Sequence, residues 1–141
     1  MIDIFDPNNW VEDDHEFRLY GDNNAQVWAI VDEIDYHYFI KWAWRIKLSR
    51  GGHKLYLFRT VYDGGPNCRK SIFLHVEVMH RTGIEQPYGH TLVDHRNGNS
   101  LDCRRQNLRW ATPSMNRRNL YGQASHELTD ATDTKAMEQD I

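Results

Sequence analysis

The clearest structural pattern in the sequence lies in residues 92–119, "LVDHRNGNSLDCRRQNLRWATPSMNRRN". It opens with a short apolar run that predicts a β-strand ending at Asp94 and His95. The polar residues that follow, with their Asn-Gly pair, predict a loop, and "LRWAT" predicts a second short strand. Thr112 followed by Pro113 is typical of a helix N-terminus. The predicted order is therefore strand, loop, strand and helix.

Three side chains of this segment are expected to converge. A hairpin packed on a helix brings the end of its first strand close to the first turns of that helix, which places Asp94 and His95 near Asn116. Carboxylate and carboxamide oxygens are hard ligands that suit Mg²⁺ or Mn²⁺. A histidine, with a pKa near neutrality, suits the removal of a proton from water. Together with the surrounding arginines, these groups predict a metal-assisted phosphodiester hydrolase.

These residues resemble the HNH endonuclease family, in particular the homing-type nucleases common in phages. The resemblance rests on residues 92–119 and on "LHVEVMH" at 74–80, and it is specific from about residue 72 to 119. The family's last motif position, often His, is Asn116 here, which makes this an H-N-N variant. The resemblance implies an α+β fold built on a ββα-metal finger.

The resemblance also implies a role for each motif residue. His95 is expected to act as the general base, with Asp94 and Asn116 as ligands of one divalent metal ion, Mg²⁺ or Mn²⁺. Asn107 is expected to brace the loop through backbone hydrogen bonds and so to orient His95. The expected function is a metal-dependent DNA endonuclease that nicks one strand. The alternative is a non-catalytic DNA-binding module on the same scaffold, although none of Asp94, His95 and Asn116 has been lost.

Double-stranded DNA is the expected partner, and the charge distribution is compatible with it. Net charge is −3, yet residues 1–40 hold ten acids and one base, whereas residues 41–60 hold six bases and no acid. The basic middle is expected either to face a polyanion or to be neutralised by the acidic ends within the fold. His75 is expected either to touch the phosphate or to pack beneath the site. The candidate DNA-contacting residues are Arg69, Lys70, His75, Arg96, Arg104, Arg105, Arg109, Arg117 and Arg118.

Four regions are expected along the chain. Residues 1–24 form an acidic N-terminal arm, and residues 25–71 form a β-rich lead-in of mostly antiparallel strands, with a helix, which is also a candidate DNA-contacting lobe. Residues 72–121 form the HNH module, and residues 122–141 form a disordered acidic tail.

Several classes of protein and site are not expected. There is no apolar run of about 18 residues, as a membrane span requires, and the N-terminus lacks a signal-peptide pattern. Two distant cysteines, Cys68 and Cys103, argue against a structural zinc site and against a disulfide scaffold. The sequence therefore predicts a cytoplasmic protein. The resemblance to phage nucleases implies the cytoplasm of a bacterial host, and a monomer or a weak dimer is expected.

Overall fold

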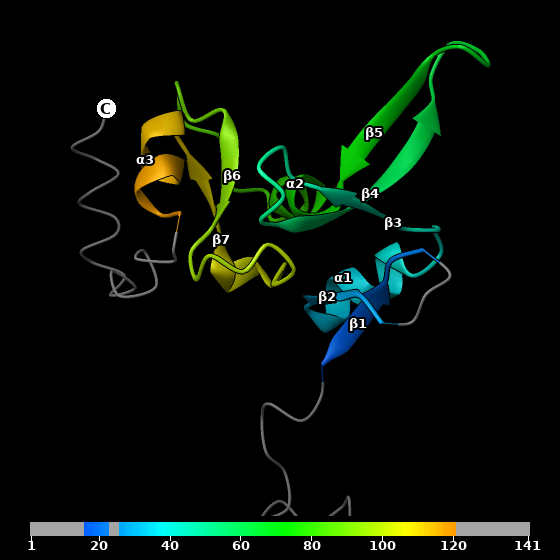
Figure 1. Cartoon of the computed structure of the whole chain (residues 1–141), viewed down its shortest axis with the longest axis horizontal. Helices are drawn as coiled ribbons and strands as arrows, with labels where there is room; N and C mark the ends of the chain where they lie inside the picture. Colours follow the sequence, from blue (N-terminus) through cyan, green and yellow to red (C-terminus); the bar gives the residue numbers. More distant parts are fainter. Residues whose placement is uncertain (1–15, 23–25, 121–141) are drawn as a thin grey trace, which may run out of the picture.

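The computed structural model describes residues 16–22 and 26–120 (Figure 1). The elements in chain order are β1 (Phe17–Tyr20), β2 (Trp28–Val31), α1 (Glu33–Phe39), β3 (Arg45–Leu48), β4 (Leu55–Tyr62), β5 (Arg69–Phe73), α2 (Leu74–Arg81), β6 (Leu92–His95), the 3₁₀ turn η2 (Arg105–Asn107), β7 (Leu108–Ala111) and α3 (Pro113–Arg118). The mixture of helices and antiparallel strands agrees with the expected α+β class. Among the described helices, none is long and apolar enough to cross a bilayer.

The strands form three small antiparallel sheets, β1-β2, β3-β4-β5 and β6-β7. In Figure 1, α2 lies between the β6-β7 hairpin and the three-stranded sheet, and α1 lies beside β1 and β2. The β4-β5 hairpin projects away from the other elements. In β2 the burial alternates along the strand, as expected for a sheet with one face toward the core.

One hydrophobic core joins the lead-in to the HNH segment. It includes Phe39 of α1, Leu57 of β4, Val78 of α2 and Trp110 of β7, all at most 4% exposed. Backbone hydrogen bonds add to this junction, because Ile30 of β2 donates to Leu101 O at 2.8 Å and accepts from Cys103 N at 2.8 Å. The hydrophobic core is therefore continuous across the predicted boundary at residue 72.

A buried carboxylate ties three elements together. Asp35 of α1 is 0% exposed, and its carboxylate accepts hydrogen bonds from Arg105 Nε (2.9 Å) and Nη2 (2.8 Å) and from Arg81 Nε (3.1 Å). Asp32 adds a bond, since its Oδ2 accepts from the Arg105 backbone N at 2.8 Å. Buried charges need such partners, because an unpaired carboxylate in the interior is strongly unfavourable.

The acidic arm predicted over residues 1–24 differs from the structure at its end. Phe17–Tyr20 forms β1, which pairs with β2 in the register Phe17↔Val31 to Tyr20↔Trp28. Leu19 is buried, and burial of its apolar side chain explains why this part of the acidic segment packs as a strand. Residues 1–15 and the predicted tail at 122–141 lie outside the described residues.

Candidate active site

The β6-β7 hairpin and α3 form the predicted strand, loop, strand and helix. The two strands pair in the register Asp94↔Arg109 and His95↔Leu108. At the start of the loop, Gly98 adopts a positive φ of 76° and its N donates to His95 O at 2.9 Å. This turn is one of the places where glycine is needed, because other L-residues rarely adopt that conformation. The turn leaves Asp94 and His95 at the mouth of the loop.

Asn107 closes the loop from its far end. Its side-chain Oδ1 accepts from Asn97 N at 3.0 Å, and its Nδ2 donates to Asp102 O at 2.8 Å and to Asn97 Oδ1 at 3.0 Å. Its backbone O accepts from Arg96 N at 2.8 Å. These are loop-bracing bonds of the kind that the resemblance implied, and they fix the backbone next to His95.

Asp94 is held by two donors on the same oxygen. Its Oδ2 accepts from Arg109 Nε at 3.0 Å and from Asn119 Nδ2 at 2.8 Å. Within the part of the chain that the structure describes, Oδ1 accepts no hydrogen bond, so it remains available to a ligand. Burial raises the pKa of Asp94, and the charge of Arg109 with these two bonds offsets part of that rise.

The surroundings of His95 favour the neutral form of its imidazole ring. It is 6% exposed, and its ring centroid lies 4.9 Å from that of His75 and 6.1 Å from that of Tyr56. Burial lowers the pKa of His95 well below its usual range, and electrostatic interactions with His75 and Lys54 lower it further. A general base must be unprotonated before it can accept a proton, and this environment keeps His95 in that form.

Cys103 lies beside the His95 ring, with its Sγ 4.0 Å from Nε2. Burial raises the pKa of the Cys103 thiol, which keeps it protonated and unreactive. Its second contact is with Ser100 O at 3.8 Å. The thiol therefore packs against the Nε2 side of the His95 ring and makes a weak polar contact with it. The other ring nitrogen, Nδ1, lies away from Cys103.

A cavity of about 440 Å³ brings the predicted residues together. Asp94, His95 and Asn116 all line it, and Asn116 is exposed on α3. Among the described residues, no three His, Cys, Asp or Glu side chains cluster as metal ligands, so the candidate donors are one carboxylate and one carboxamide. Two hard oxygen donors on an open cavity fit Mg²⁺ or Mn²⁺, which retain several waters when protein-bound.

Part of the lining of this cavity, which we call the basic wall, is positively charged. It consists of Lys47 of β3, Arg50 of the following turn and Lys54, the residue before β4, and Tyr56 and Phe73 line the same cavity. The three cations belong to the run "RIKLSRGGHK" at 45–54 of the predicted DNA-contacting lobe, whereas Tyr56 and Phe73 were not among the predicted site residues. Cations at this position can hold a phosphate next to the carboxylate of Asp94 and the carboxamide of Asn116.

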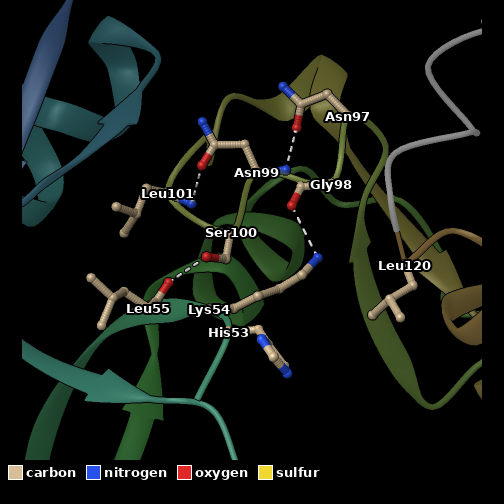
Figure 2. Close-up of a pocket in the computed structure, with 9 residues that line it drawn as sticks. All are labelled: His53, Lys54, Leu55, Asn97, Gly98, Asn99, Ser100, Leu101 and Leu120. Atoms are coloured by element: carbon tan, nitrogen blue, oxygen red, sulfur yellow. Dashed lines mark hydrogen bonds between the residues drawn. The ribbon is translucent and has the colours of Figure 1, made fainter. Parts of the chain in front are cut away.

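The loop after β6 is fastened to this basic wall. Lys54 Nζ donates to Gly98 O at 3.0 Å, and Ser100 Oγ donates to Leu55 O. Figure 2 shows both bonds at a second hollow, of about 570 Å³, between the start of β4 and the residues 97–101. Asn97 and Asn99 cap their own loop there, with their side-chain oxygens accepting from the N of Asn99 (2.9 Å) and Leu101 (3.0 Å).

Three of the predicted DNA-contacting arginines form ion pairs with buried carboxylates. Arg109 is 8% exposed and bonded to Asp94, and Arg105 makes the paired bonds to Asp35 described above. Arg104 donates to both oxygens of Asp102 at 2.9 and 2.8 Å. These ion pairs give each guanidinium a part in the fold, and the contact of these arginines with DNA stays a prediction.

The remaining predicted contacts are distributed over several elements. Arg69 and Lys70 are exposed on β5, and Arg117 and Arg118 are exposed in the last turn of α3. Arg96 is half-buried in the loop after β6. His75 lines the cavity and packs against His95, so it lies beside the site rather than away from it.

Asn119 was not among the site residues predicted from the sequence. It is 3% exposed, and its Nδ2 reaches Asp94 Oδ2 and also His95 O at 2.9 Å. The only signal was its spacing, one helical turn after Asn116, which places both on the side of α3 near the hairpin.

The fold and the site together describe a mixed α/β protein in which hard oxygen donors, a neutral imidazole and a group of cations line one cavity. Residues 77–118 match the model of the HNH endonuclease family. The match supports the HNH family for this segment and, in general terms, a nuclease acting on nucleic acid. Neither the curated proteins nor the solved structures gave a match to the chain.

Proposed function

We propose that this protein is a metal-dependent endonuclease that hydrolyses phosphodiester bonds in double-stranded DNA. The observation that carries the proposal is that one cavity is lined both by Asp94, His95 and Asn116 and by Lys47, Arg50 and Lys54. The first group suits water activation and metal binding, and the second suits the binding of a phosphate.

Each residue has a defined part in the proposed reaction. His95 accepts a proton from the attacking water at Nδ1, the ring nitrogen away from Cys103. Asp94, through Oδ1, and Asn116, through its amide oxygen, would hold one Mg²⁺ or Mn²⁺ ion. A bound divalent ion supplies positive charge that stabilises the phosphate and the leaving oxygen in the transition state. Lys47 and Arg50 position the DNA backbone without reading its sequence.

The proposed product is a nick, because one such centre acts on one phosphodiester bond at a time. We place the protein among the homing-type H-N-N nucleases of phages, acting in the host cytoplasm.

The test is incubation of supercoiled plasmid with the protein in Mg²⁺, in Mn²⁺ and in EDTA, beside His95→Ala. We expect open-circle product with a metal, no product in EDTA, and a His95→Ala variant that binds DNA as the wild type does but does not cut it. Linear product would indicate paired sites. A protein that binds DNA but cuts it under none of these conditions would overturn the proposal and favour the non-catalytic binding module.

A further inference from the structure

The outer half of the β4-β5 hairpin is a two-stranded ribbon. β3 pairs with β4 only from Leu48↔Leu55 to Arg45↔Phe58, whereas β5 pairs with β4 onward from Phe58 to Tyr62. Beyond Phe58, β4 therefore has β5 as its one strand neighbour. Figure 1 shows this part of the hairpin projecting away from the other elements.

One face of the ribbon is continuous with the candidate active site. Residues opposite each other in neighbouring strands share a face, and side chains alternate between faces along a strand. Tyr56 and Phe73 line the site cavity, and their rings lie 6.1 Å apart. The strand residues on the same face, which we call the outer face, are Arg45, Lys47, Tyr56, Phe58, Thr60, Tyr62, Arg69, Ser71 and Phe73.

The outer face has the charge and the polar groups for contact with DNA. Its strand residues include three cations and no carboxylate. Toward the tip, Tyr62 is 65% exposed, and the neighbouring Arg69 and Ser71 are exposed as well. The reverse face packs on the body, since Leu57 is buried there and Arg59 donates to Glu77 of α2 at 2.9 and 2.6 Å. The outer face is thus the face that joins the site cavity to the exposed tip of the hairpin.

We propose that the outer half of the β4-β5 hairpin enters the major groove of the substrate duplex and reads its base sequence through Arg69, Thr60 and Ser71. The major groove, about 12 Å wide, admits a two-stranded ribbon. An arginine can donate two hydrogen bonds to guanine, and hydroxyl groups can bond to several bases. This inference rests on the proposed nuclease function, because it takes the duplex cut at His95 as the partner.

The length of the ribbon predicts where the sequence is read. Thr60 and Tyr62 are four and six residues beyond Tyr56, which lines the cavity. At about 3.3 Å per strand residue these positions lie roughly 13 and 20 Å further out. With a rise of 3.4 Å per base pair, the protein should read base pairs about four to six positions from the cut bond.

The experiment measures sequence preference by binding and by cleavage. Full-length His95→Ala protein selects bound duplexes from a random DNA pool, and in parallel the wild type cuts a mixed-sequence library whose ends are sequenced. We expect a base preference four to six positions from the nick. Arg69→Ala should lose that preference and weaken binding to the selected sequence by between about fivefold and a hundredfold. Arg69→Lys should keep the binding to random DNA but lose the preference.

Lys70→Ala is the matched control. It removes the same charge at the neighbouring position, but Lys70 lies on the reverse face. It should weaken binding to all sequences alike and leave the preference in place. Equal effects of Arg69→Ala and Lys70→Ala, with the preference unchanged, would overturn the inference.

The outcomes separate this inference from the nuclease proposal. If bound sequences depend on Arg69 but no DNA is cut, the nuclease proposal fails and the ribbon inference stands. If DNA is cut and Arg69→Ala keeps the same cut-site preference, or the wild type has none, the ribbon inference fails and the nuclease stands. Absence of any duplex binding overturns both.

Discussion

Replacement of Asn119 by alanine should weaken the site and the fold together. The side chain is buried and donates to Asp94 Oδ2 at 2.8 Å and to His95 O at 2.9 Å. Both acceptors keep another donor in the variant, because Arg109 still bonds to Asp94 and the N of Gly98 still bonds to His95 O. The cost is therefore that of two hydrogen bonds, at least about 2 kcal/mol, without a newly unpaired charge.

Two comparison variants sharpen this estimate. Arg109→Ala removes the positive charge beside buried Asp94 and should cost about 3–5 kcal/mol, more than Asn119→Ala. Asn116→Ala removes an exposed side chain and should change the free energy of unfolding by no more than about 0.5 kcal/mol. As a proposed metal ligand, Asn116 should nevertheless be essential for cleavage.

The assays are urea unfolding, followed by tryptophan fluorescence, and plasmid nicking over a range of Mg²⁺ concentrations. Asn119→Ala should need more metal or cut about 10–100 times more slowly, because Asp94 loses one of the two groups that orient it. Wild-type stability and wild-type nicking in Asn119→Ala would refute the reasoning. So would an Asn116→Ala variant that is destabilised as much as Asn119→Ala.

Two further predictions concern stability alone. Asp35→Ala leaves the guanidinium groups of Arg81 and Arg105 without their shared carboxylate and should lower the free energy of unfolding by about 3–5 kcal/mol in urea titrations; a loss below 1 kcal/mol would contradict the role given to this cluster. Burial lowers the pKa of His75 from 6.5 to about 4, so between these pH values the unfolded chain binds a proton that the folded protein excludes, and stability is lost as the pH falls. The free energy of unfolding falls by up to about 3 kcal/mol for this reason. The His75→Phe variant should therefore lose less stability than the wild type between pH 7 and pH 4.5. Equal losses in the two proteins would show that His75 is not the cause.

The hairpin and helix of the site could be predicted because their signals are local. Thr112 caps α3 as expected, with its Oγ1 accepting from Met115 N at 3.1 Å, and Pro113 occupies the first turn. The Asn-Gly pair forms the turn after β6. Propensities of this kind act over a few residues, so they are visible in one stretch of sequence.

The role of Arg105 could not be predicted because its partner is distant in the sequence. Arg105 bonds to a carboxylate 70 residues earlier, and nothing in "DCRRQN" distinguishes it from an arginine that faces DNA. The clustered bases at 45–54 were visible in the sequence. Their place in the same cavity as Asp94 could not be predicted, because it depends on how the three-stranded sheet packs on α2. Tertiary packing, rather than local pattern, decides which charges remain free.

The bond between Arg105 and Asp35 also bears on how the protein is made. The N-terminal part of the chain leaves the ribosome first. Helix α1 therefore emerges long before η2 and β7 have been synthesised and can pack near it. Contacts over such a separation require closure of a large loop and form late. We expect nascent chains that stop before residue 105 to leave Asp35 without the paired bonds from Arg105 and to remain incompletely folded. The β6-β7 hairpin and its support from α1 are then completed together, so the proposed nuclease activity is expected only of chains synthesised through α3.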